Sequence, residues 1–214
     1  ISATTTNTPN NHTPKDVTIN DIRDQGLRVL LRSRLPLCYF LRFLLEEHSC
    51  ENLICYLEIE HYESQQYDTT FEQQTAALQI LDVYLSPRSP FEVNVTERAH
   101  AQCQAAIASE DAEKIVACFL NVKPAVFQLL LDAYMRFARS EWWRSMVGQL
   151  DGKHFYSIED RNATVSHLIG YLDRLHKHDL VHAPDRAALF RELIADFCRT
   201  VVGVEIIITS SPPD

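Results

Sequence analysis

Residues 119–140 have the sequence FLNVKPAVFQLLLDAYMRFARS, and they introduce a long apolar-rich segment from Ala125 to Trp143. Apolar and aromatic side chains recur along this segment at the three- and four-residue spacing of one helix face. The positions concerned are Phe127, Leu130, Leu131, Tyr134 and Phe137. We predict that the segment is the helical spine of the core, and that Gly148 and Gly152 mark the break after it.

Helix start signals and apolar stripes predict further helices on both sides of this spine. Thr18 and Asp21 form a capping-box pattern at the start of the first helix. The segments predicted before the spine are 22–34, a helix beginning at Pro36, 50–64, 71–85, a helix beginning at Thr96, and 110–120. Two more are predicted after it, over about 159–176 and 185–201. An apolar β-branched stretch over 204–209 then either packs back on the bundle or binds a partner.

Composition also favours a helical fold. The chain has 214 residues, 46% of them hydrophobic, and only five glycines. Such a chain can bury one good core with a small appended subdomain. Residues 1–17 are rich in Thr, Asn and Pro and have little to bury, which predicts disorder. We therefore predict an all-α protein with a helical domain over 18–147 and a C-terminal helical extension and tail over 148–214.

Charge and cysteine content restrict the partners and the compartment. The net charge of -9 argues against nucleic acid, which requires a basic face, and fits poorly with an anionic membrane surface. The six cysteines show no CxxC spacing, so we interpret them as buried free thiols of a reducing compartment. No secretory leader opens the sequence and no apolar run approaches the roughly 20 residues of a membrane helix. We expect a cytoplasmic protein without a transmembrane segment.

Residues 84–98, YLSPRSPFEVNVTER, interrupt the helical pattern. Pro87 and Pro90 each remove a backbone donor and bias the preceding residue towards extended conformations. Thr96 is placed to cap the next helix. Alternation within this loop predicts that Val93 and Val95 point inward and Asn94 outward. The loop is therefore expected to hold an exposed amide side chain between two fixed ends.

Three places combine polar residues with apolar runs at the ends of elements: Ser49, Glu51 and Asn52; Asn94; and Asp132 with Arg136. Each place has a structural explanation. Ser49 and Glu51 suit a helix N-terminus through capping and the helix dipole. Asp132 and Arg136 are four residues apart and can pair for about 0.3–0.5 kcal/mol. Asn94 can close its own turn. The alternative to these structural explanations is that the residues at all three places bind a partner.

The three places lie within the stretches 41–63, 89–103 and 119–140, and each stretch contains a recognisable sequence motif. Glu51-Asn52 opens a helix with Tyr56 four positions later, and Glu92-Val93-Asn94 lies in a loop before a helix. Phe119 and Phe127 are eight residues apart, and Asp132 to Phe137 have the pattern Asp-x-Tyr-x-Arg-Phe. In this order, residues 21–147 resemble the regulator of G-protein signalling (RGS) family.

The resemblance implies a four-helix bundle joined to a subdomain made from both ends of the domain. It also implies a non-enzymatic regulator that binds a GTP-bound heterotrimeric G-protein α subunit and accelerates its GTP hydrolysis. The residues that match the family's contacts to the switch regions are Ser49, Glu51, Asn52, Asn94, Asp132 and Arg136, with Leu129 as a further candidate. In the family this Arg also braces the Asp.

The sequence departs from the family's pattern at several positions. Cys55-Tyr56 replaces the usual Phe-Trp, Ala133 replaces a common Ser, and one residue is missing between Leu129 and Asp132. An RGS-like scaffold that binds a signalling partner without activating it therefore stays as the alternative function. We expect no cofactor and no metal, because pairs such as His176 with His178 offer too few ligands. We further expect a monomer with recruitment to the inner face of the plasma membrane.

Overall fold

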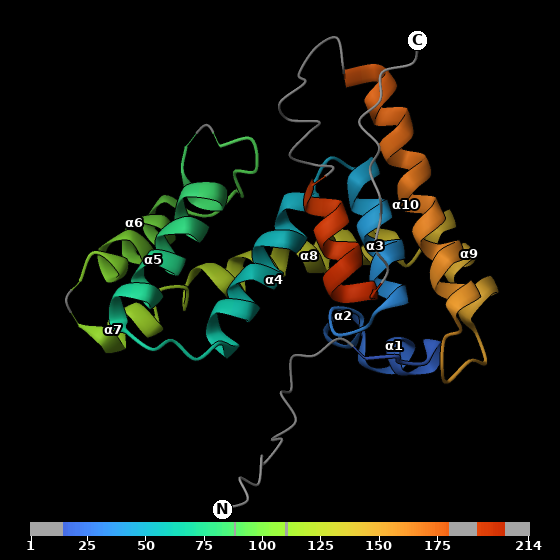
Figure 1. Cartoon of the computed structure of the whole chain (residues 1–214), viewed down its shortest axis with the longest axis horizontal. Helices are drawn as coiled ribbons and strands as arrows, with labels where there is room; N and C mark the ends of the chain where they lie inside the picture. Colours follow the sequence, from blue (N-terminus) through green and yellow to red (C-terminus); the bar gives the residue numbers. More distant parts are fainter. Residues whose placement is uncertain (1–14, 88, 110, 180–191, 204–214) are drawn as a thin grey trace, which may run out of the picture.

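The computed structural model describes residues 15–87, 89–109, 111–179 and 192–203 (Figure 1). Regular structure within these ranges is helical, apart from one isolated β-bridge between Lys15 and Ser33. The elements are α1 Ile19–Gln25, α2 Leu27–Leu30, α3 Leu35–Glu46, α4 Cys50–Ser64, α5 Thr70–Ile80, the π-helix η1 Leu81–Leu85, α6 Glu97–Ile107, α7 Ala112–Val116, α8 Val122–Phe137, α9 Glu141–Leu150, α10 Ile158–Asp179 and the π-helix η2 Cys198–Val202. The predicted all-α class is confirmed.

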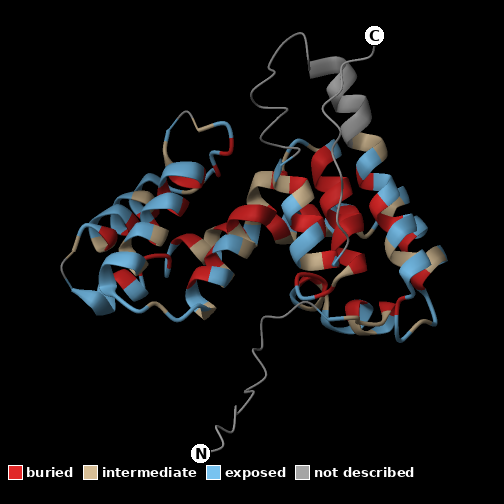
Figure 2. Ribbon diagram, in the orientation of Figure 1, coloured by how far each residue is buried: buried red, intermediate tan, exposed pale blue. Residues whose placement is uncertain are grey.

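Four helices form a closed bundle in which each packs against two others. The contacting pairs are α4 with α8, α8 with α6, α6 with α5, and α5 with α4. Helices α1, α2, α3 and α9 form a second group beside this bundle, made from the two ends of the domain (Figure 1). Buried residues run along α3 and the inner faces of α4 and α5 (Figure 2). This is the predicted arrangement of bundle and terminal subdomain.

Predicted helix starts match the structure best where a local capping signal exists. Thr18 accepts a hydrogen bond from the backbone N–H of Asp21 at 3.1 Å, and the Asp21 carboxylate accepts one from the N–H of Thr18 at 3.0 Å, so the capping box is formed. The single helix predicted after it is wrong, because Gly26 adopts a φ of 67° and separates α1 from α2. Only glycine reaches this conformation without strain.

The predicted spine is also broken earlier than expected. Helix α8 ends at Phe137, and α9 begins at Glu141. The hydroxyl of Ser140 accepts a hydrogen bond from the N–H of Trp143 at 3.2 Å and donates one to the carbonyl of Phe137 at 2.7 Å. A capping serine thus ends one helix and starts the next, whereas Gly148 lies inside α9.

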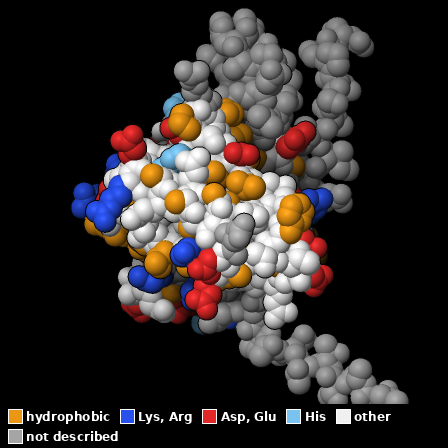
Figure 3. Space-filling view, turned by 90° about the vertical axis from the view of Figure 1, so that its left-hand side faces the viewer, with side chains coloured by type: hydrophobic (Ala, Val, Ile, Leu, Met, Phe, Trp, Pro, Cys, Tyr) orange, Lys and Arg blue, Asp and Glu red, His pale blue; other side chains and the backbone are white. Residues whose placement is uncertain are grey.

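The end of the molecule formed by α5, α6 and α7 differs most from the predicted stripes. Leu78 shares a heptad-like spacing with the buried Leu81 and Leu85 but is 44% exposed, and the helix predicted over 110–120 is the shorter α7, capped by Asp111. Phe71, Val116 and Leu120 are exposed as well. Figure 3 shows this end, where hydrophobic side chains appear as several separate spots.

The described residues near both ends of the chain contact the helical domain. Residues 1–14 of the segment predicted to be disordered lie outside the described residues, but Lys15 donates a hydrogen bond from its N–H to the carbonyl of Arg32 at 2.8 Å. Helix α10 packs on α3. Residues 192–202 are helical through η2, whereas 185–191 and 204–209 lie outside the described residues. All six cysteines are buried and free, as predicted.

A polar and aromatic cluster attaches α9 and α10 to α3. The Arg42 guanidinium lies between two rings, with its carbon 4.6 Å from the centroid of Trp142 and 4.3 Å from that of Tyr171. Arg42 pairs with Glu46 at 2.6 Å, and the Trp142 indole N–H donates to the same carboxylate at 2.7 Å. The Tyr171 hydroxyl donates to the carbonyl of Leu45 at 2.9 Å. We call these residues the Arg42 cluster.

Candidate functional site

The first group of candidate residues lies at the start of α4. His48 has a φ of 54° and turns the chain from α3 into α4. The side-chain amide of Asn52 donates to the carbonyl of Ser49 at 3.2 Å. The predicted cap is not formed, since the buried Ser49 hydroxyl has no hydrogen-bond partner among the described residues. Glu51 and Asn52 are half-buried at the N-terminus of the helix, where a carboxylate is favoured by the helix dipole.

The second group is the loop between η1 and α6. The N–H of Val93 donates to the carbonyl of Tyr84 at 2.8 Å, and the N–H of Phe91 donates to the Ser89 hydroxyl at 3.2 Å. Phe91 and Val93 are buried, whereas Asn94 is exposed. The predicted inward Val93 and outward Asn94 are therefore confirmed.

Thr96 closes the other end of this loop. Its hydroxyl accepts a hydrogen bond from the N–H of Ala99 at 3.3 Å, so the predicted cap of α6 is confirmed. Pro90 is exposed and precedes the buried Phe91. The backbone around Asn94 is thus fixed on one side by bonds to η1 and on the other by a helix cap.

The third group lies in the C-terminal half of α8, and here the expected pairing is wrong. Arg136 binds Glu47 with two hydrogen bonds, from Nε at 2.9 Å and from a terminal nitrogen at 2.6 Å. It reaches only the backbone carbonyl of Asp132, at 3.2 Å. The Asp132 carboxylate instead accepts a hydrogen bond from the Gln128 amide at 3.1 Å. Glu47 offers both carboxylate oxygens to the planar guanidinium of Arg136. Asp132, one turn earlier on α8, is reached only through its backbone carbonyl.

Helix α4 lies next to both of the other groups. Glu47, which holds Arg136, lies at the end of α3, in the turn that leads to α4. The N–H of Val93 ties the loop to the carbonyl of Tyr84 in η1. Burial raises the pKa of Tyr84, and the neighbouring groups that add to this rise, Glu58 first, all lie on α4. The α8 group therefore borders the start of α4, and η1, which carries the loop, borders the same helix.

Two features of this region are not apparent from the spacing of the candidate residues. The role of Glu47 depends on a partner 89 residues away, although the paired acids Glu46-Glu47 just before the α4 start are a visible signal. Met135 is 52% exposed on α8 beside Asp132 and Arg136. Leu129, the further candidate, is half-buried and packs against the core. The surface formed by the candidate residues therefore combines charged, amide and apolar groups.

Two broader properties concern the described part of the chain. None of its helices has the length and apolar character required to cross a membrane. No three His, Cys, Asp or Glu side chains gather there in a way that could hold a metal ion. Its exposed candidate groups are amides, carboxylates and one guanidinium, which suit hydrogen bonding to another protein.

Comparison with known proteins agrees with this geometry. No curated protein matches the chain at a significant level. The family model for the regulator of G protein signaling domain matches residues 27–146, more than half of the chain. The matched range includes the α4 start, the Asn94 loop and α8. The chain therefore belongs to the RGS domain family.

Proposed function

We propose that this protein accelerates GTP hydrolysis by a heterotrimeric G-protein α subunit. The observation that carries the proposal is the Asn94 loop, in which the backbone that bears an exposed amide is held between a helix cap and the Val93–Tyr84 backbone hydrogen bond to η1. An RGS domain implies a role in regulating G-protein signalling. A fixed amide adds the means to position a mobile segment of the partner.

The chemistry requires no catalytic group from this chain. The α subunit carries its own arginine and a glutamine that orients the attacking water. A partner accelerates hydrolysis if it holds these groups in the transition-state arrangement, which is preorganisation. In this proposal Asn94 contacts the switch segment beside that glutamine. Ser49, Glu51 and Asn52 contact the switches from one side, and Asp132 and Arg136 from the other.

The same proposal specifies the partner and the setting. The partner is the GTP-bound α subunit, bound by a monomer of this chain in the cytoplasm, with recruitment to the inner face of the plasma membrane. The Glu47–Arg136 pair supports the role of α8, because it orients a guanidinium at the edge of the contact area. We infer that this arginine positions the segment around Asp132 through its backbone carbonyl.

Single-turnover GTP hydrolysis tests the proposal. Wild type is added to GTP-loaded α subunits of several classes, and Asn94→Ala is expected to lose at least about tenfold of the acceleration. Asn162→Ala is the matched control, because Asn162 is an exposed asparagine on α10, outside the candidate groups. A folded wild type that accelerates none of the α subunits would contradict the proposal.

Binding that depends on aluminium fluoride provides a second measure. Aluminium fluoride with GDP mimics the transferring phosphoryl group, so a transition-state stabiliser binds that form more tightly than the plain GDP form. Equal affinity for the two forms, measured by calorimetry, would argue against transition-state recognition.

Binding without activation is the second candidate function. One observation favours it: Arg136 is engaged by Glu47, and the Asp132 carboxylate is held by Gln128 rather than by Arg136. In that case the same face binds a signalling partner as a scaffold. Tight binding of α subunits with no change in hydrolysis rate would support this function over activation.

A further inference from the structure

The C-terminal helix, defined as residues 192–202, has a buried apolar face and a second face on which apolar side chains alternate with Glu192, Asp196 and Thr200. Ile194, Cys198 and Val202 are buried and belong to the main core. Burial raises the pKa of the Cys38 thiol on α3, and the nearby Cys198 adds to this rise. One face of the helix is therefore packed on α3 as part of the core, although the helix lies outside the residues matched by the family model.

The second face lines a cavity of about 840 Å³ between this helix and the RGS domain. Its apolar lining includes Leu193, Phe197 and Val201 from the C-terminal helix, Ile54 from α4, Val83 from η1 and Phe91 from the Asn94 loop. Figure 1 shows the C-terminal helix beside α4, as this shared lining requires. The space under the loop is thus bounded on one side by residues of the extension.

Phe91 connects this cavity to Asn94. The ring is 5% exposed, and its residue lies three positions before Asn94 in the loop. The Phe91 N–H is bound to Ser89, and the Val93 N–H to Tyr84. A displacement of the Phe91 backbone into the cavity would strain these two bonds. Phe91 is therefore the residue through which the cavity can influence the loop that carries Asn94.

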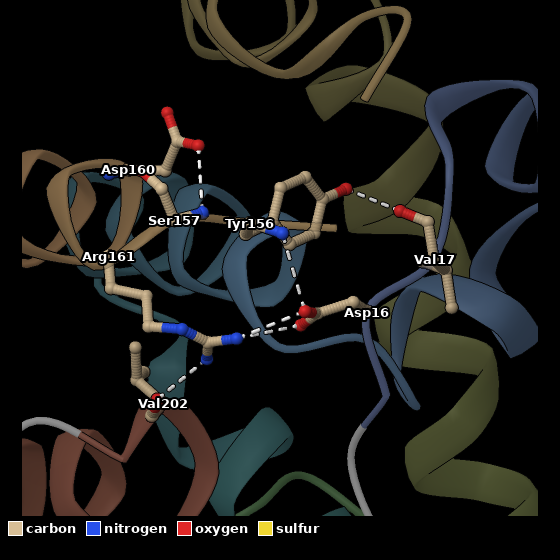
Figure 4. A network of polar contacts seen from close by, with 7 residues as sticks. All are labelled: Asp16, Val17, Tyr156, Ser157, Asp160, Arg161 and Val202. Atoms are coloured by element: carbon tan, nitrogen blue, oxygen red, sulfur yellow. Dashed lines mark hydrogen bonds and ion pairs between the residues drawn. The ribbon is translucent and has the colours of Figure 1, made fainter. Parts of the chain in front are cut away.

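A polar network holds the end of the C-terminal helix in place (Figure 4). The Arg161 guanidinium donates to the carbonyl of Val202 at 3.1 Å and to the Asp16 carboxylate at 3.0 and 3.2 Å. The N–H of Tyr156 donates to the same carboxylate at 3.4 Å, and the Tyr156 hydroxyl donates to the carbonyl of Val17. Three distant parts of the chain meet at Arg161, so the helix is attached at its end as well as along its core face.

We propose that the C-terminal helix braces the Asn94 loop from below, and that Leu193, Phe197 and Val201 are positioning residues for Asn94. The effect on hydrolysis rests on the proposed function, but the effect on the loop does not. These residues act through Phe91, and the open volume of the cavity leaves the bracing incomplete. Removing side-chain volume from the helix should therefore loosen the loop, and adding volume should tighten it.

Hydrogen–deuterium exchange of the full chain tests the bracing without any α subunit. In the double variant Leu193→Ala/Val201→Ala, amides of residues 91–95 should exchange about tenfold faster, because local opening of the loop becomes easier. The control is Arg199→Ala, an exposed position on the same helix that does not line the cavity. Unchanged loop exchange in the double variant would overturn the proposal.

A second variant covers the case in which the double variant does not fold. Val201→Phe adds a ring to a half-buried position on the cavity wall and leaves the core face of the helix intact. Loop exchange should slow by about threefold while exchange in α8 stays the same. Loop exchange equal to wild type in this variant would contradict the bracing.

Hydrolysis kinetics separate this inference from the proposed function. If wild type activates an α subunit, the double variant should lower the maximal single-turnover rate by about tenfold with the half-saturating concentration unchanged, since only the positioning of Asn94 is affected. A rise in the half-saturating concentration alone would contradict a positioning role. If wild type does not activate, the proposed function fails, while the exchange result still decides the bracing.

Discussion

Two neighbouring carboxylates at the end of α3 hold two arginines in very different surroundings. Glu46 pairs with Arg42, which is 2% exposed and lies between Trp142 and Tyr171. Glu47 pairs with Arg136, whose side chain is 56% exposed. The first pair joins α3 to α9 and α10, and the second joins the end of α3 to α8 beside the candidate site. The same chemical pair is therefore buried against aromatic rings on one side and exposed beside the candidate site on the other.

The largest expected effect is on the buried side. Arg42→Ala removes the guanidinium and its stem from between two rings, so the free energy of unfolding should fall by about 2–4 kcal/mol. Chemical denaturation followed by tryptophan fluorescence measures it. Arg42→Met, which keeps most of the stem, should lose less. A loss under about 0.5 kcal/mol for Arg42→Ala would remove the distinction between the two arginines.

A smaller effect on stability is expected at the exposed pair. Arg136→Ala should change the free energy of unfolding by less than about 1 kcal/mol, because water already screens this pair. The acceleration of GTP hydrolysis by this variant should nevertheless fall about tenfold, because Arg136 belongs to the proposed contact residues. Glu47→Gln and Glu46→Gln form a matched pair of adjacent substitutions. If Glu46→Gln impaired hydrolysis more than Glu47→Gln, the assignment of the two sides would be reversed.

The smallest change in GTP hydrolysis is expected in the loop. Pro90→Gly frees the backbone before Phe91. The free energy of unfolding should fall by about 0.4–1 kcal/mol, mainly because the unfolded chain gains conformational entropy. Hydrolysis should slow by about threefold, because Asn94 is held less firmly. Single-turnover kinetics and a denaturation curve on the same sample measure both. Undiminished activity would show that the proline does not contribute to bracing.

Local sequence features predicted the helices better than the contacts between them. The start of α3 follows from Pro36 within its first turn, the range of α4 follows from the predicted helix over 50–64, and the outward Asn94 follows from alternation. The Asp132–Arg136 pairing failed because spacing along one helix does not include a competing partner 89 residues away. Ser49 similarly has the residue type of a cap, but its backbone turn does not bring the hydroxyl to an N–H.

Other differences arose from the environment of each helix. Leu78 continues an apolar stripe but lies where α5 has no neighbour to cover it, so 44% of it is exposed. The break between α8 and α9 depends on Ser140, a capping residue inside an apolar run that periodicity alone passes over. The cavity beneath Phe91 depends on residues 192–202 folding back on α4. The exposure of Leu78 and the cavity are set by tertiary packing, whereas the break at Ser140 is a local capping signal that apolar periodicity does not include.

The Arg42 cluster also bears on where the folding unit ends. The family match stops at residue 146, but one of the two rings over Arg42 belongs to Tyr171, and Arg161 of the same helix holds the segment before α1. A fragment cut at residue 146 would keep the candidate contact residues but expose to solvent the surface of α3 that carries Arg42. Ile194, Cys198 and Val202 also belong to the main core, so for recombinant expression the physical domain extends through residue 202.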